Sequence, residues 1–119
     1  AAEISLSASL PRFEKMTFDA LSEPALADHL SAFGRKTVII AGMETHICVF
    51  FTAMHFLEEG YRVAVVSDAV CSRSAAHRET ALLQLRQSGC LVVPAETVLF
   101  SLTERGGTDQ FRKISSIVK

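Results

Sequence analysis

The chain has 119 residues, a formal net charge of −1, and a hydrophobic fraction of 49%. This is the size of one domain, and the composition is apolar enough to bury a core rather than remain disordered. The balanced charge argues against nucleic-acid binding, and no apolar run approaches the roughly 18 residues of a membrane span.

The cysteines, Cys48, Cys71 and Cys90, are an odd number without the short spacing of a metal site. They argue against a disulfide framework and for a reducing compartment, so we expect a cytoplasmic protein. Cys71 and Cys90 are interpreted as packing residues. The sequence shows no secretory leader pattern and begins Ala-Ala-Glu rather than with Met, which predicts a fragment or a processed chain.

Short β-branched runs at residues 37–42, 62–66 and 90–93 are apolar on both faces, which is typical of buried parallel strands. Between these runs lie segments whose apolar residues recur at helical spacing. One helix is expected from Pro24 to Gly34, a second over about 45–59, and a third from a cap at Ser74 to Gly89. The second is so apolar that we expect it to lie between the sheet and another surface, such as a second subunit. The alternation predicts parallel βαβ units.

The two ends of the chain are less regular. A short helix is expected over about 96–102, and Thr108 is a candidate cap for a last helix after the break at Gly106 and Gly107. Residues 4–10 alternate apolar residues with Ser, and either a strand or a disordered arm fits them. Three parallel strands are few for an open sheet, and one would keep a bare apolar edge, which predicts that strands are missing from this chain.

The segment 42–49 is the first candidate for chemistry, because it joins the end of a buried strand to a helix. A thiol at Cys48, in the first helical turn, lies near free amides and the positive end of the helix dipole, which favour the nucleophilic thiolate. The alternative is a small cysteine buried in the core.

Several motifs around Cys48 carry a wider pattern. They are Lys15 with Phe18, the run Val-Ile-Ile-Ala-Gly-Met-Glu-Thr-His-Ile-Cys-Val at 38–49, Thr52-Ala53, Gly-Tyr-Arg-Val at 60–63, Val-Ser-Asp-Ala at 66–69, and Ser-Arg-Ser at 72–74 with His77. From about Lys15 to Leu102 the chain resembles the isochorismatase-like hydrolase family, and especially its small single-domain members. The resemblance implies a three-layer α/β/α, Rossmann-like parallel sheet. Residues 1–119 would form one domain that holds only the C-terminal part of this fold.

The resemblance also implies a catalytic triad of Asp, Lys and Cys. Cys48 matches the nucleophile and Lys15 the lysine, whose charge would favour the thiolate. The backbone amides of Cys48 and Glu44 would hold the oxyanion, with a cis peptide bond between Met43 and Glu44. The expected substrate-pocket residues are Phe18, Met43, Thr45 and Phe51.

The third member of the triad has no counterpart. In the family an Asp follows the first strand, and no such run precedes Lys15. Asp19 stands where the family has Ser, and Asp28, Asp68 and Asp109 do not match the pattern. Asp68 is expected to cap a strand end. Either a separate chain supplies the base, or the part that carries it is absent.

The residues and the resemblance together predict a hydrolase with a Cys nucleophile that acts on an amide-like C–N bond of a small molecule. We expect no cofactor, no metal, no nucleic-acid or membrane partner, and a homo-oligomer. His46, His55 and His77 lack the spacing of a zinc site. The alternatives are an inactive oligomerising relative, a fragment without its base, and a redox or nucleotide-binding domain. The last lacks a Cys-x-x-Cys, Gly-x-Gly-x-x-Gly or phosphate-loop motif.

Overall fold

Three parallel strands form the centre of the computed structural model, which describes residues 7–119. They are β1 (Thr37–Met43), β2 (Arg62–Cys71) and β3 (Leu91–Val93), in the spatial order β1-β2-β3. The register pairs Thr37 with Arg62 in β1 and β2, and Ala64 with Leu91 in β2 and β3. The predicted parallel α/β sheet is confirmed.

The helices lie close to the predicted positions. They are α1 (Pro24–Phe33), α2 (Phe50–Glu58), α3 (Ala75–Gln87), α4 (Ala95–Thr103) and α5 (Asp109–Val118), with a 3-10 turn at Ala20–Ser22 before α1. Gly34 takes φ 73° after α1, the left-handed conformation that glycine adopts without strain. Ser74 and Thr108 cap α3 and α5 as predicted, because their hydroxyls accept hydrogen bonds from the amides of His77 and Phe111.

Two elements differ from the sequence prediction. The helix expected over 45–59 begins with a π-helical turn, Thr45–Val49, and becomes α-helical only at Phe50. The amides of Ile47 and Val49 both donate to the carbonyl of Glu44, and the second of these bonds closes the wider turn. The second strand is longer than predicted and runs to Cys71, because its end pairs with Gly42 and Met43 after a break in register.

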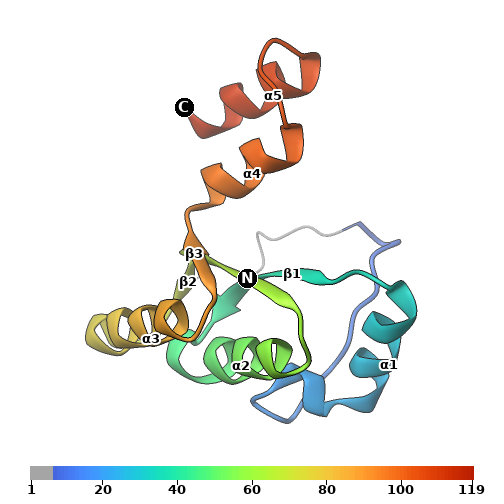
Figure 1. The fold of residues 1–119 in the computed structure, drawn as a ribbon, viewed down its shortest axis with the longest axis vertical. Coiled ribbons are helices and arrows are strands. Elements are labelled where there is room, and N and C mark those ends of the chain that lie inside the picture. The colour runs from blue at the N-terminus through green and yellow to red at the C-terminus, as the bar shows by residue number, and fades with distance from the viewer. Residues whose placement is uncertain (1–6) are drawn as a thin grey trace.

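The core lies between the sheet and the helices α2 and α3, which cover one face together (Figure 1). α4 and α5 extend away on the other side. The buried residues of the core are Val49, Ala53, Phe56, Val63, Val65, Val70, Leu82, Leu85 and Cys90. The other face of α2 is only partly covered, since Phe50, Met54 and Leu57 are half-buried.

The other face of the sheet and the outer edge of β1 remain open among residues 7–119. β1 is an edge strand with no described strand on its outer side. Ile39 and Leu91 are half-exposed and line a hollow of about 260 Å³ beside α4. The bare apolar edge predicted from the sequence is therefore present.

Within residues 7–119, no helix has the length and hydropathy that crossing a lipid bilayer requires. Residues 4–6 of the ambiguous N-terminal segment lie outside the described part of the chain. In the rest of that segment, the amide of Leu10 donates to the carbonyl of Ser7 in a turn.

Candidate functional site

A small hollow of about 160 Å³ lies where the outer edge of β1 meets the start of α2. Both residues that the sequence marks for catalysis, Lys15 and Cys48, line it. The other lining residues are Ala20, Ile40, Ala41, Met43, Val49 and Thr52. The fold therefore brings Lys15 and Cys48, far apart in the sequence, to the lining of one hollow.

Cys48 lies in the π-helical turn that leads into α2, and its side chain is half-buried. It is thus neither sealed in the core nor fully exposed. The turn follows directly from β1 through the peptide bond between Met43 and Glu44, which is cis as the resemblance implied. The thiol thus lies at the start of the helical segment that follows a strand, the position expected of a nucleophilic cysteine.

Lys15 belongs to an irregular segment that precedes α1, and its side chain is exposed. Its Nζ donates to the carbonyl oxygens of Thr17 at 2.9 Å and Phe18 at 3.4 Å. The segment thus folds around its own lysine. Glu23 fixes the same segment by accepting hydrogen bonds from the amides of Met16 and Thr17, which hold the pKa of this carboxyl below its usual value.

Residues of the loop between β2 and α3 hold the turn that carries Cys48. The amide and Nε of Arg73 donate to Oε1 of Glu44 at 3.0 and 2.9 Å. These bonds lower the pKa of the Glu44 carboxyl. Next to them, the hydroxyl of Ser72 accepts from the amide of Thr45 at 3.1 Å and lies 3.0 Å from Nδ1 of His46. The loop that follows β2 therefore holds the end of β1 in place.

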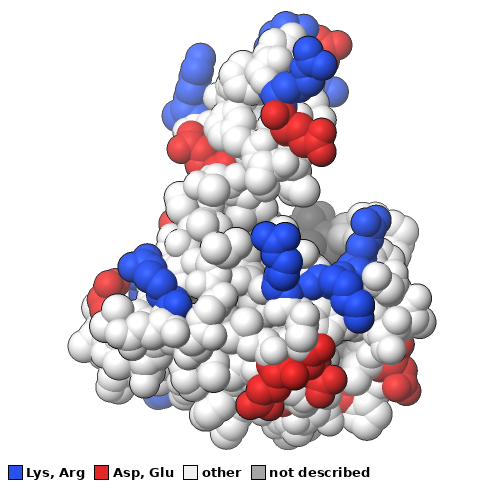
Figure 2. Space-filling view, viewed as in Figure 1, with Lys and Arg blue, Asp and Glu red and all other residues white. Residues whose placement is uncertain are grey.

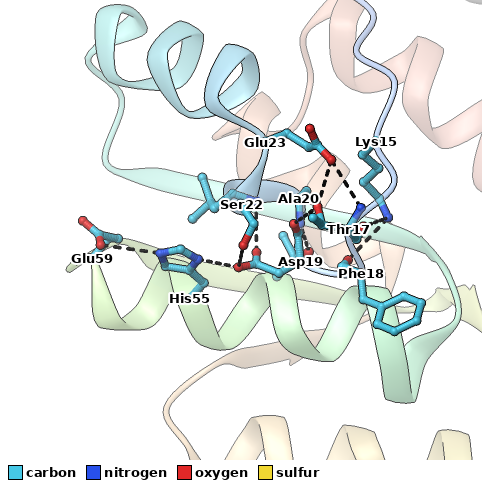
Figure 3. A network of polar contacts seen from close by, with 11 residues as sticks. Lys15, Thr17, Phe18, Asp19, Ala20, Ser22, Glu23, His55 and Glu59 are labelled. Atoms are coloured by element: carbon cyan, nitrogen blue, oxygen red, sulfur yellow. Dashed lines mark hydrogen bonds and ion pairs between the residues drawn. The ribbon is translucent and has the colours of Figure 1, made fainter.

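Asp19 joins the lysine segment to α2 (Figure 3). Its Oδ1 accepts from the amide of Leu21 and its Oδ2 from the hydroxyl of Ser22, both at 2.9 Å, so it caps the 3-10 turn. The same Oδ2 lies 2.5 Å from Nδ1 of His55 on α2. Burial acts to raise the pKa of Asp19, but these hydrogen bonds outweigh it and the pKa is lowered. The bond to Asp19 raises the pKa of His55.

The four expected pocket residues are not all in one place. Met43 lines the hollow with Cys48, whereas Phe18 and Phe51 line a neighbouring hollow of about 550 Å³ together with His55. The side chain of Thr45 is fully buried, and its hydroxyl oxygen has no hydrogen-bond partner among residues 7–119. Their roles toward a substrate stay predictions.

Other candidate residues have local structural partners. The rings of His46 and His77 lie 4.8 Å apart, and no group of three or more potential metal ligands occurs within residues 7–119. Asp68 accepts from the amide of Ala95 at 2.8 Å at the start of α4, but it does not cap a strand end as expected, because β2 continues past it to Cys71. Cys90 is a packing residue, and burial raises the pKa of its thiol.

The expectation for Cys71 was wrong: its side chain is exposed, because it stands at the end of β2 on the open side of the sheet. Accessibility alone therefore does not distinguish Cys48 from every other thiol of this chain.

An isochorismatase domain model matches residues 2–97, most of the chain. The chain belongs to the isochorismatase family. It is 40% identical over 109 residues to the secreted isochorismatase effector Isc1 of Phytophthora sojae, an alignment that covers 90% of this chain and 51% of that protein. The chain spans about half the length of the curated relatives it matches.

Solved structures of the isochorismatase fold are also similar. The MAR1 ribonuclease of Caenorhabditis elegans matches with 32% identity and a TM-score of 0.78, over 87% of this chain and 53% of that one. The YcaC protein of Escherichia coli, an octameric hydrolase of unknown specificity, matches with 31% identity and a TM-score of 0.65, over 68% and 40%. The nicotinamidase/pyrazinamidase PncA of Bacillus subtilis matches with 27% identity and a TM-score of 0.65, over 67% and 44%.

The family pattern alone did not reveal the residues that hold the candidate site of this isochorismatase-family chain in place. Asp19 was visible as a departure from the family's Ser, but the sequence does not pair it with His55. Thr52 was part of the family motif, yet its contact with the amide of Ala20, at 2.9 Å, appears only in the fold. Glu44 and Arg73 carried no sequence signal of their pairing.

Proposed function

We propose that this chain carries the nucleophile of a hydrolase that cleaves an amide-like C–N bond of a small molecule, with Cys48 as the nucleophile. One observation supports this more than any other. Cys48 and Lys15, the two residues matched to the family triad, line one hollow at the end of a parallel strand. Ligands of open α/β sheets bind at this end of the strands.

In the proposed reaction, a base takes the proton from Cys48 and the thiolate attacks the carbonyl carbon of the amide. A C–S bond forms, and the C–N bond breaks when the tetrahedral intermediate collapses. The leaving nitrogen takes up the proton and departs as the amine or ammonia. Water then attacks the thioester, which releases the carboxylic acid and restores the thiol.

The charge that develops on the carbonyl oxygen would rest on the backbone amides of Cys48 and Glu44. A donor of this kind contributes about 3–4 kcal/mol to the transition state in enzymes where it has been removed. The Arg73 contacts to the Glu44 side chain support this role by fixing the residue that carries one amide. Lys15 would add an ammonium charge that favours the thiolate.

We propose that the base comes from a segment that lies beside β1 in the complete protein. None of the described residues that line the hollow carries a carboxylate. The outer edge of β1, which borders the hollow, pairs with no described strand, and a strand placed there could bring an Asp to Cys48. A second chain at the same edge would serve equally.

The size of the hollow and the surface charge favour a small substrate. The hollow of about 160 Å³ beside Cys48 is large enough for a small reacting group. Figure 2 shows acidic and basic side chains interspersed on one face of the molecule, so that face offers no continuous basic surface for nucleic acid. The relatives show that nicotinamidase activity and an octameric assembly both occur on this fold. We therefore propose a small amide as substrate and a homo-oligomer as the working form.

Three unpaired cysteines support a reducing, cytoplasmic location for this chain, although a secreted relative shows that the fold also occurs outside the cell.

The test is a screen of small amides with the complete protein that contains this chain, followed by C48A, K15M and the control K113M. We expect C48A to abolish turnover with an unchanged circular dichroism spectrum, and K15M to lower kcat/KM by about tenfold or more. Lys113 is an exposed residue of α5, so K113M should behave as the wild type. Full activity in a folded C48A would contradict the proposal.

The competing hypothesis is an inactive, oligomerising relative, and the hollow without a carboxylate is the observation that favours it. It predicts that no amide is turned over in the complete protein and that Cys48 reacts with electrophiles no faster than an ordinary exposed thiol.

A further inference from the structure

The segment that carries Lys15 is attached to α2 by two side-chain contacts, and both are made to one face of that helix. Thr52 Oγ1 accepts from the amide of Ala20 at 2.9 Å, and Nδ1 of His55 lies 2.5 Å from Oδ2 of Asp19. Figure 3 shows His55 between Asp19 on the segment and Glu59, the residue after its own helix. Its Nε2 lies 3.6 Å from Oε1 of Glu59.

This face of the helix is also the face of the nucleophile. Residues 52 and 55 follow the spacing by which side chains share one side of an α-helix, and Cys48 lies in the π-helical turn that leads into that helix. Cys48, Thr52 and Ala20 all line the same hollow. A shift of the segment along α2 would therefore move Lys15 relative to the thiol.

Asp19 is well placed to transmit such a shift. It accepts from Leu21 and Ser22 within its own segment, and its third contact, with His55, reaches the helix. Four hydrogen bonds lie within the segment, from Lys15 to Thr17 and Phe18 and from Met16 and Thr17 to Glu23, and they tie its residues to one another.

We propose that Asp19 and His55 are positioning residues for the reaction: their contact holds the segment 15–23 on α2 and so keeps Lys15 beside Cys48. This inference rests on the proposed function of Cys48 and Lys15, and it gives a role to the position where the family's Ser is replaced by Asp19.

The charges around His55 decide over which pH range the contact is strong. Asp19 faces it from the segment, Glu58 from the end of α2 and Glu59 from the residue after that helix, and Asp28 and Lys36 line the hollow on its α1 side. The bond to Asp19 raises the pKa of His55 above 6.5, and the bond from His55 helps to hold the pKa of Asp19 below 3.8. Both partners are therefore charged throughout the interval from 3.8 to 6.5, and the attraction weakens above the raised pKa of His55.

The first measurement is hydrogen exchange of the Ala20 amide by NMR, because this amide bonds to Thr52 only while the segment is in place. D19N keeps a side-chain oxygen that can cap the 3-10 turn but removes the charge, and H55Q removes the imidazole. The matched control is D28N, which removes a carboxylate that lines the hollow on the α1 side of His55 but makes no described hydrogen bond or ion pair with it. We expect Ala20 in D19N and H55Q to exchange about tenfold faster than in D28N at pH 6, and the difference to shrink above the pKa of His55.

The second measurement is the rate at which iodoacetamide alkylates Cys48 in a C71S background. We expect D19N to lower this rate by about tenfold relative to D28N, since small misplacements of a helper group are costly. In K15M the same D19N change should alter the rate by less than about twofold, because there is no ammonium group left to misplace. H55Q should give the same pattern, and it serves if D19N fails to fold.

The outcomes separate the inference from the function on which it rests. Unchanged Ala20 exchange in both variants, or an equal loss of Cys48 reactivity with and without Lys15, overturns the positioning role while leaving Cys48 as the candidate nucleophile. A wild-type Cys48 that reacts no faster than Cys71 overturns the proposed function, and the Ala20 exchange still decides whether Asp19 and His55 hold the segment.

Discussion

Lys15 and Cys48 line the same hollow, although one belongs to an irregular segment and the other to the turn that opens α2. The proximity of Lys15 to Cys48 depends on contacts made by other residues. Asp19 and Ala20 attach the lysine segment to α2, and Arg73 and Ser72 fix the turn from the other side. The chemical role of the hollow can therefore be tested apart from the stability of the fold that forms it.

Iodoacetamide should distinguish the three cysteines. We expect Cys48 to be alkylated below about pH 8 and faster than exposed Cys71, because the proposed nucleophile should be the more reactive thiol. Cys90 should react only on unfolding, since it is 4% exposed and its pKa is raised by burial. Peptide mass spectrometry after timed quenching measures all three rates. Cys71 reacting ahead of Cys48 across the whole pH range would remove the main support for the nucleophile.

The Glu44–Arg73 pair should matter for the site more than for stability. Arg73 is 83% exposed, so R73A should leave the melting temperature nearly unchanged. We expect E44Q and R73A each to slow Cys48 alkylation, and the double variant to be no slower than either one, because both remove the same contact. The control is R112A, whose partner Asp109 lies on α5. Additive losses from E44Q and R73A would show that they act separately.

Two leucines of α3 should differ sharply in their effect on stability. Leu85 is fully buried between α3 and the sheet, whereas Leu83 is 53% exposed on the same helix. L85A should lower the free energy of unfolding by about 2–5 kcal/mol through lost burial and a cavity. L83A should stay within about 0.5 kcal/mol of the wild type. Urea denaturation of both variants checks this, and similar values would contradict the described packing of α3.

The Asp19–His55 contact should make stability depend on pH with a defined sign. The pKa of His55 is raised on folding, so its contribution is present below 6.5 and is lost as the pH rises through the raised value. The pKa of Asp19 is lowered, so its contribution is present above 3.8 and is lost as the pH falls through the lowered value.

Wild type should therefore exceed H55Q in free energy of unfolding most clearly between pH 3.8 and 6.5, with the difference declining on both sides. Chemical denaturation at a series of pH values measures it, with D28N as the reference for an aspartate outside the contact. A difference that grows steadily toward pH 9 would mean that the neutral imidazole, rather than its ion pair, stabilises the fold.

The periodicity of apolar residues in the sequence determined where the strands and helices lie. Burying one face of a helix or strand requires apolar residues at a regular spacing, and this spacing is visible in a single sequence. Val38 to Ala41 and Val63 to Val66 indicate buried strands, and Ser74 and Thr108 mark helix starts whose caps the structure confirms. The motif around Cys48 likewise consists of neighbouring residues along the chain, so the sequence by itself displays it.

Contacts between distant residues were decided by the tertiary structure alone. The periodicity of apolar residues shows which face of a helix or strand is buried, but it does not show which loop packs against that element. The sequence therefore could not pair Asp19 with His55 or Glu44 with Arg73. It also could not foresee that Val49 would bond back to Glu44 and widen the first turn, or that Cys71 would stand on the open side of the sheet. These features depend on packing in three dimensions. The energy of such a contact is set by residues that are close in space but distant in the sequence, and a local sequence pattern does not identify them.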